Sequence, residues 1–355
     1  LWLVAATAVA QFVAWIVEWT RRGPHGLWLM RGVTAALVAV MGGLIVTDRV
    51  VGLLDRSPTI EVLLAALNGS KGSWGPWSHS VLAILLAAAA AVAVGAVAAH
   101  ALARRPPRDE MRAESSLYPR RANPGSDLAA TLRMDRAAVW RSVPLRRGFA
   151  VLAVLPGLVA LASALEWYML NILPGLVASG GALLFGVNSW CLEGRGALWR
   201  ESLPGRAQLA FFTRVVVLAE VLLAATVLTL ALASVRAGVP TGSQVVAVAC
   251  ATLVVTFQVV SGSMRWSVRR PFAVDMRSAR ATPAPPLTMV GYSTRLALAT
   301  TFTGMLFVAT SDAPWHWSVL LAVPFLLFSA LRLVRTSAVW EQPETRSRVV
   351  TTVAS

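Results

Sequence analysis

The chain has 355 residues, of which 56% are hydrophobic and only 14% are charged. Because a soluble globule of that composition could not cover its surface with polar groups, the composition argues against a soluble enzyme and predicts an all-α, polytopic membrane protein. Its 32 basic and 17 acidic residues give a net charge of +15. The arginines gather in short segments between apolar runs, which is typical of membrane topology and argues against a nucleic-acid partner.

Nine segments are apolar and long enough to span a membrane, which takes about 20 residues for roughly 30 Å of hydrocarbon. The apolar run from 148 to 187 is too long for one span and divides at the interfacial residues Glu166, Trp167 and Tyr168. Residue 1 lies inside an apolar run with no preceding Met, so we expect further sequence upstream. The predicted spans are 1–19, 28–47, 78–103, 148–165, 168–187, 209–235, 244–262, 289–310 and 316–334.

Arginine in the connections predicts the orientation of these spans. Residues 104–147, 189–208, 263–288 and the segment after 334 are rich in arginine and should be cytoplasmic, whereas the alternate connections of this part contain only Arg236. The alternation is consistent with a bacterial cytoplasmic membrane and a cytoplasmic C-terminus. It places residues 48–77 outside, where 58–67 predicts a short capped helix that is interfacial or re-entrant.

The first cytoplasmic segment has two parts. Residues 104–126 are rich in Pro, Arg, Ser and Gly and predict a linker. Residues 127–147 predict an amphipathic helix, capped by Ser126 or Asp127, that lies on the inner membrane surface with Trp140 near the headgroups. A solvated linker helix is the alternative. The apolar stripe of this helix consists of Leu128, Leu132, Val139 and Val143.

Catalytic motifs are absent from the sequence. It contains no phosphate-binding loop of the Gly-x-x-x-x-Gly-Lys type, and its single lysine is Lys71. Its four histidines have no metal-ligand spacing, and no Ser-His-acid pattern is present, so we expect no catalytic residue, metal or cofactor in this chain. Cys191 and Cys250 lie in separate segments and predict no structural disulfide.

Ionisable residues inside spans are costly in lipid and are therefore informative. Glu220 is expected near mid-membrane, facing protein or a wet cavity. It would line a substrate path or act as a proton-titratable group; the alternative is a structural ion pair or hydrogen bond with a neighbouring helix. Arg214 and Arg295 lie one to two turns from the cytoplasmic ends of their spans and are expected to reach the interface as topological anchors. The small residues from Gly175 to Gly181 predict a close helix approach.

The cytoplasmic loop after the fifth span carries the most specific pattern. Asn188 is followed, after four residues, by Glu193-Gly194, then by Trp199 and by Pro204 before the next span. This order resembles the loop of bacterial type-2 ABC transporter permeases of the two-half antibiotic and multidrug efflux kind, although the spacing to Trp199 is one residue longer than in that pattern. The segment from Ser267 to Phe272 is similar to the basic-Pro segment of such a half.

The resemblance implies an architecture. Residues 1–103 would be the C-terminal part of a first transmembrane half, 104–126 a linker, 127–147 the connecting helix, 148–335 a second half with six spans, and 336–355 a cytoplasmic tail. It also implies a permease that exports lipophilic compounds, driven by two copies of a cytosolic ATPase subunit that would hold the ATP and Mg. Another connecting helix and three more spans would then precede residue 1.

In such a permease, the loop after the fifth span would couple the ATPase to the spans, because only a stiff contact transmits a conformational change. An ordinary helical turn is the alternative reading of the loop. A proton-coupled secondary transporter that uses Glu220 and a membrane scaffold without a transport role are the rival functions. The expected coupling residues are Glu193, Gly194, Ala197, Leu198, Trp199, Arg200 and Pro204.

Overall fold

The computed structural model contains helices and no strands in the residues that it describes. Seven of these helical segments are long and apolar enough to cross a membrane, which confirms the coarse prediction of a polytopic helical membrane protein. The seven are Trp28–Ile45, Trp74–Ala103, Pro144–Ala162, Trp167–Leu184, Ala207–Ser234, Gly242–Arg269 and Trp315–Glu341. The structure describes all residues except 1, 24, 48, 50–51, 53–63, 65–66, 105–121, 123, 195, 204 and 274–282.

Two of the nine predicted spans are helical but are not among the seven. They correspond to α1 (Trp2–Arg21) and α13 (Pro286–Thr310). Both contain polar residues within the helix, including Glu18 in α1 and Arg295 in α13, which lowers their apolar character. The count of nine therefore stays a prediction.

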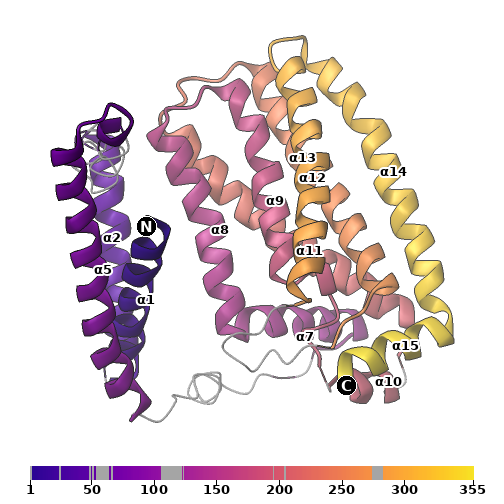
Figure 1. The fold of residues 1–355 in the computed structure, drawn as a ribbon. Helices are drawn as coiled ribbons and strands as arrows, with labels where there is room; N and C mark the ends of the chain where they lie inside the picture. Colours follow the sequence, from indigo (N-terminus) through magenta and orange to yellow (C-terminus); the bar gives the residue numbers. More distant parts are fainter. Residues whose placement is uncertain are drawn as a thin grey trace. The chain divides into compact units, whose positions relative to one another are not determined.

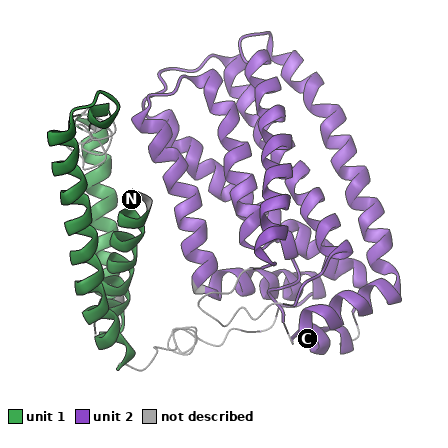
Figure 2. Ribbon diagram, viewed as in Figure 1, with its two compact units in different colours: residues 1–109 green, residues 110–355 purple. Residues whose placement is uncertain are grey.

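The chain divides into two compact units, Leu1–Asp109 and Glu110–Ser355 (Figure 2). In unit 1, α1 packs against α2 (Gly26–Val46) and α5 (Trp74–Ala103). The division between the units falls in the segment 104–126. The helix predicted at 58–67 lies mostly outside the described residues.

Unit 2 is a helical bundle whose most buried elements are α9, α11 and α12 (Figure 1). Apolar side chains of α9, α11 and α12 pack together in its largest core, joined by residues of the loop after α9. Its elements are α7 (Asp127–Arg141), α8 (Val143–Ala162), η1 (Trp167–Ile172), α9 (Leu173–Leu184), η2 (Gly186–Asn188), α10 (Gly196–Ser202), α11 (Ala207–Ser234), α12 (Gly242–Arg269), α13, α14 (Trp315–Glu341) and α15 (Pro343–Ala354).

The two ends of unit 2 differ. At one end, the Trp167 Nε1 donates a hydrogen bond to the Gly238 carbonyl at 2.8 Å, and the Gln244 side chain donates to Asp312 at 3.1 Å. At the other end lie α7, α10 and α15 (Figure 1). We call this second end the α7/α10/α15 end.

The predicted close helix approach at Gly175 is confirmed. A Cβ added to Gly175 would lie 3.1 Å from the Thr300 carbonyl oxygen, so α9 and α13 meet where a larger residue would not fit. One turn further along α9, the hydroxyls of Ser179 and Thr300 form a buried hydrogen bond of 2.9 Å.

The C-terminal segment is more ordered than the predicted tail 336–355 implied. The last long helix, α14, continues to Glu341, and α15 then packs on unit 2 with Val349, Val350 and Val353 buried. Pro343 at the start of α15 prevents α14 from continuing as a straight helix.

Candidate functional site

The predicted coupling residues lie in the loop between α9 and α11, at the α7/α10/α15 end. The chain turns through η2, passes Glu193, and enters the short helix α10 after Gly194, whose φ of +48° is a conformation that other residues rarely adopt. The side chain of Ala197 is buried, whereas Leu198 and Trp199 are exposed. Pro204 lies outside the described residues.

A buried group of four charged residues fixes the base of this loop. It consists of Asp135 from α7, Glu193 from the loop, Arg200 from α10 and Arg214 from α11, and we call it the ion cluster. Both Arg200 and Arg214 bond to Asp135 Oδ1, at 3.0 and 3.1 Å, and both also bond to Glu193 Oε1. Thr213 completes the cluster by donating to Asp135 Oδ2 at 2.8 Å.

Arg214 is buried within protein and does not extend to the surface, as a side chain that anchors the helix at the interface would. Its side chain is fully buried, and its Nη1 donates to the Ser189 carbonyl at 2.9 Å. Its guanidinium also lies 5.4 Å from the centre of the Trp190 ring, a distance typical of a cation–π contact. Two carboxylates compensate the charge of Arg214 and Arg200, so the guanidinium has no need to extend to water.

Asp135 is the functional candidate that the sequence analysis missed. It follows Leu132 by three residues and precedes Val139 by four, so it falls on the predicted apolar stripe of α7. A carboxylate on an apolar stripe requires a buried cation, and that was the available signal. The stripe therefore packs on protein in part: it does so at Val139, which is buried, but not at Leu128, which is exposed.

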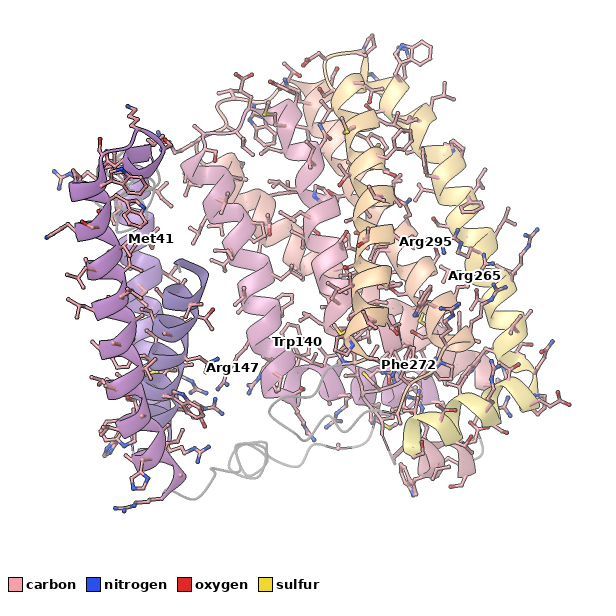
Figure 3. The ribbon with its side chains drawn as sticks, viewed as in Figure 1. Met41, Trp140, Arg147, Arg265, Phe272 and Arg295 are labelled. Carbon is pink, nitrogen blue, oxygen red and sulfur yellow. The ribbon has the colours of Figure 1, made fainter. Side chains whose placement is uncertain are left out.

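The residues around Asn188 tie the loop to the segment after α12. The Asn188 amide donates to the carbonyls of Phe272 at 2.8 Å and Pro283 at 3.1 Å. The Ser189 backbone N–H donates to the Ser267 hydroxyl at 2.8 Å. Phe272, labelled in Figure 3, thus belongs to the same end of the molecule as the loop.

Aromatic stacking joins the loop to the C-terminal helices. The rings of Trp190 and Trp340 are nearly parallel, with centroids 4.0 Å apart, and the Trp340 Nε1 donates to the Ala207 carbonyl at 3.0 Å. Beside them, Cys191 is buried, and burial raises the pKa of its thiol to about 12. Both Cys191 and Cys250 are free thiols.

One face of α10 remains open to solvent. Trp199 is 63% exposed and Leu198 is 50% exposed. Behind α10, Arg346 of α15 pairs with Glu201, and a pocket of about 300 Å³ lies between α10, α7 and α15. This arrangement presents an apolar tip on a base held by buried ion pairs.

Glu220 forms an ion pair with Arg136 of α7, through both carboxylate oxygens. Both side chains are about half exposed. The hydrogen bond with Glu220 raises the pKa of Arg136, which keeps that guanidinium charged. Glu220 was expected either to line a substrate path or titrate with protons, or to form a structural ion pair. The structure contains the ion pair, with α7 as the neighbouring helix. Trp140, on the same helix, packs edge-on against Phe149 (Figure 3).

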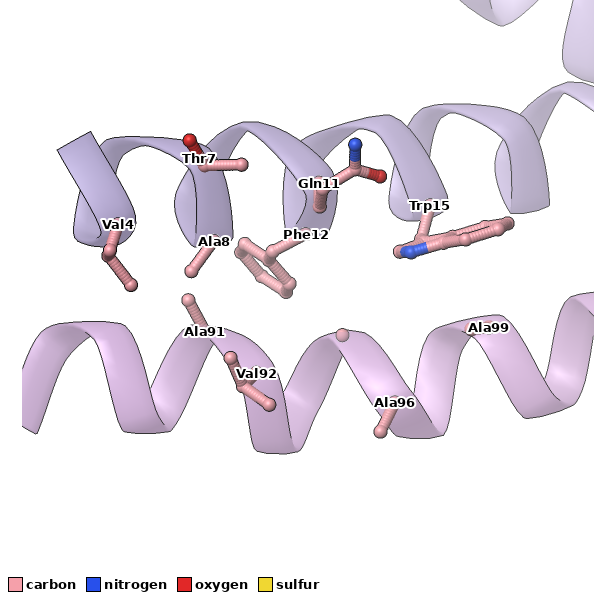
Figure 4. Close-up of a pocket in the computed structure, with 11 residues that line it drawn as sticks. Val4, Thr7, Ala8, Gln11, Phe12, Trp15, Ala91, Val92, Ala96 and Ala99 are labelled. Atoms are coloured by element: carbon pink, nitrogen blue, oxygen red, sulfur yellow. The ribbon is translucent and has the colours of Figure 1, made fainter.

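A second cavity, of about 580 Å³, lies in unit 1 between α1 and α5. Its lining is apolar except for Thr7 and Gln11, and Figure 4 shows Ala8 of α1 opposite Ala91 of α5. Such a groove suits an apolar ligand or lipid chain. The described part of the chain contains no group of three His, Cys, Asp or Glu side chains placed to hold a metal.

The chain matches no known family model, no curated protein and no solved structure.

Proposed function

We propose that this chain is the permease subunit of an ATP-driven efflux pump that exports lipophilic compounds, and that α10 is its contact with a separate cytosolic ATPase subunit. The observation that supports it best is the exposed apolar tip of α10, Trp199 and Leu198, on a base tied down by the ion cluster. An exposed tryptophan on the open face of a short helix is a favourable anchor for a partner groove.

The ion cluster supports coupling because it connects α10 to two longer helices. Arg200 of α10 and Arg214 of α11 share Asp135 of α7, so a displacement of α10 acts on all three elements. A displacement of a loop with few tertiary contacts would change only the local conformation of that loop. A packed ionic contact transmits the displacement to the helices that it joins.

The decisive experiment compares two tryptophan substitutions in the full chain. Trp199→Ala should leave the protein folded, because its ring is mostly exposed, while removing the partner contact. Trp315→Ala is the matched control, since Trp315 is 57% exposed at the opposite end of unit 2. We expect an ATPase subunit to co-purify from native membranes with the wild type and with Trp315→Ala, but with at least tenfold less yield for Trp199→Ala. ATP-dependent export of a lipophilic dye from vesicles should fall in parallel.

Two results would decide against this function. If Trp199→Ala exported at the wild-type rate, contact through the Trp199 side chain of α10 would not be needed for export. Flux driven by a pH gradient without ATP, and lost in Glu220→Gln, would favour the proton-coupled transporter. Glu193→Ala is a weaker test than Trp199→Ala, because it also leaves buried guanidinium charge uncompensated.

A further inference from the structure

Three arginines from three adjacent helices meet near the α7/α10/α15 end of unit 2. Arg265 of α12 and Arg295 of α13 both lie close enough to Arg332 of α14 to act on its charge, and Figure 3 labels Arg265 and Arg295. A Cβ added to Gly262 would lie 3.9 Å from Nη1 of Arg332, so this guanidinium rests against α12 one turn from Arg265. We call these three residues the arginine cluster.

The arginine cluster has no anionic partner among the residues that the structure describes. None of the three guanidinium groups forms a salt bridge or a side-chain hydrogen bond there, in contrast to the ion cluster, where each guanidinium has two carboxylates. The Arg332 Nε is buried without a hydrogen-bond partner. Like charges repel each other, so an external anion would relieve the repulsion among the three guanidinium groups.

The cluster lies about 8 to 10 Å inside the edge of a hydrocarbon layer centred on these helices, on the side of the α7/α10/α15 end. Arg295 lies nine residues after the start of α13 and Arg332 nine residues before the end of α14, which places both about 13 Å from this end of the helices. Helices of this length exceed the roughly 30 Å hydrocarbon core, and arginine side chains extend toward the headgroups. The guanidinium groups are therefore within reach of lipid phosphates.

An exposed apolar surface continues from the cluster toward the middle of the helices. Leu298 and Phe302 follow Arg295 along one face of α13, and both are exposed. The ring of Phe328, one turn deeper than Arg332 on α14, is exposed as well, and its centroid lies 4.6 Å from the Arg332 Cζ. The charged side chains thus lie nearer the membrane surface and the apolar side chains lie deeper. A phospholipid has the same order, with its phosphate at the surface and its acyl chains below.

We propose that Arg265, Arg295 and Arg332 form a binding site for the phosphate group of an anionic phospholipid, whose acyl chains lie along Leu298, Phe302 and Phe328. Arginine suits this role, because its planar group can donate two hydrogen bonds to one phosphate. The site is independent of the proposed pump function, because it involves neither α10 nor the ion cluster.

The test uses the full-length protein in dodecyl maltoside with added dioleoyl phosphatidylglycerol or dioleoyl phosphatidylcholine. Thermal unfolding and native mass spectrometry should show stabilisation and retained lipid with phosphatidylglycerol only. Arg295→Gln and Arg332→Gln should each weaken phosphatidylglycerol binding about tenfold or more, the effect of losing a charge-assisted hydrogen bond. Arg335→Gln removes the same charge from an exposed site on α14 and should bind as the wild type does.

Lipid-free micelles provide a second readout. Arg295→Gln removes no bond inside the protein, and Arg332→Gln removes only the cation–π contact with Phe328 while it lowers the repulsion among the three charges. Both variants should therefore unfold close to the wild-type temperature there. A clear decrease would show a structural role and overturn the proposal. Equal effects of the two lipids, or equal losses in Arg335→Gln and Arg332→Gln, would overturn it too. Stabilisation by inorganic phosphate as strong as that by phosphatidylglycerol would assign the site to a free anion instead of a lipid.

Discussion

At the scale of single residues, the environment of a charge decides its role more than its position along a helix. Arg214 and Arg295 occupy similar positions, about two to two and a half turns after the start of their helices. Arg214 is fully buried among carboxylates, and Arg295 is exposed without one. The difference arises from partners that are distant in sequence, since Asp135 and Arg214 lie 79 residues apart.

Removing Asp135 should destabilise unit 2 strongly. Asp135→Ala leaves two buried guanidinium groups with a single carboxylate, and breaking a buried ion pair in this way costs about 3 to 5 kcal/mol. Thr213→Val is the control within the same contact, because it removes one neutral donor worth about 1 kcal/mol. The comparison is made by thermal unfolding of purified full-length variants in detergent. Equal unfolding temperatures for the two variants would mean that the cluster is not a source of stability.

The sequence singled out this loop but not its internal contacts. The motif from Asn188 to Trp199 draws attention to the loop, because its Gly and Trp spacing is local information. It could not identify Arg214 as part of the same cluster, since long-range ion pairs leave no local pattern. Asp135 did leave one, as a carboxylate on the apolar stripe of α7.

At the scale of the elements, glycines fix how closely the helices of unit 2 approach. Spacing of small residues predicted the contact of α9 at Gly175, and the structure confirms it against Thr300. The partner helix, α13, could not be predicted, because small-residue spacing identifies a contact face but not what packs on it. Gly157 of α8, for which no contact was predicted, lies against α11.

Gly157→Ala should destabilise the contact between α8 and α11. A Cβ there would lie 2.8 Å from the Leu232 Cβ and 2.9 Å from the Thr229 carbonyl oxygen, so the backbones would have to separate. Overpacking of this kind costs about 1 to 3 kcal/mol. Gly291→Ala in α13 has no atom within 4 Å of the new Cβ and should stabilise its helix by up to about 1 kcal/mol. Shifts of thermal unfolding in the same direction for both variants would contradict this account of α8 packing.

At the scale of the whole molecule, hydropathy and geometry give different answers on whether α13 crosses the membrane. By composition, α13 is not among the helices that could cross a membrane. It nevertheless runs between the two ends of unit 2: the segment before it is held by Asn188 through the Pro283 carbonyl, and Asp312 just after it binds Gln244 at the opposite end. Its buried threonines face α9 and α12, so its polar residues need not meet lipid.

We therefore expect α13 to span the membrane together with α12 and α14, and single-cysteine labelling can test this. The background is the variant with Cys191→Ser and Cys250→Ser. One thiol is then introduced before α12 by Val239→Cys, and another after α13 by Trp315→Cys. Both positions are exposed at the end opposite α10. A membrane-impermeant maleimide should modify both from the same side. If α12 and α13 both cross the membrane, the chain returns after α13 to the side on which α12 began. Labelling of the two positions from opposite sides would therefore show that α13 does not cross.

Trp199→Cys completes the same experiment at the α7/α10/α15 end, where its side chain is exposed. It should be labelled only from the side opposite to Val239→Cys. The positive-inside rule assigns that side to the cytoplasm, because the arginines of α7 and α10 lie there. Intact cells should therefore label Val239→Cys and Trp315→Cys, and inverted vesicles should label Trp199→Cys. The reverse pattern would place α10 outside the cell, where no cytosolic ATPase could bind it, and would exclude the proposed pump while leaving the crossing of α13 intact.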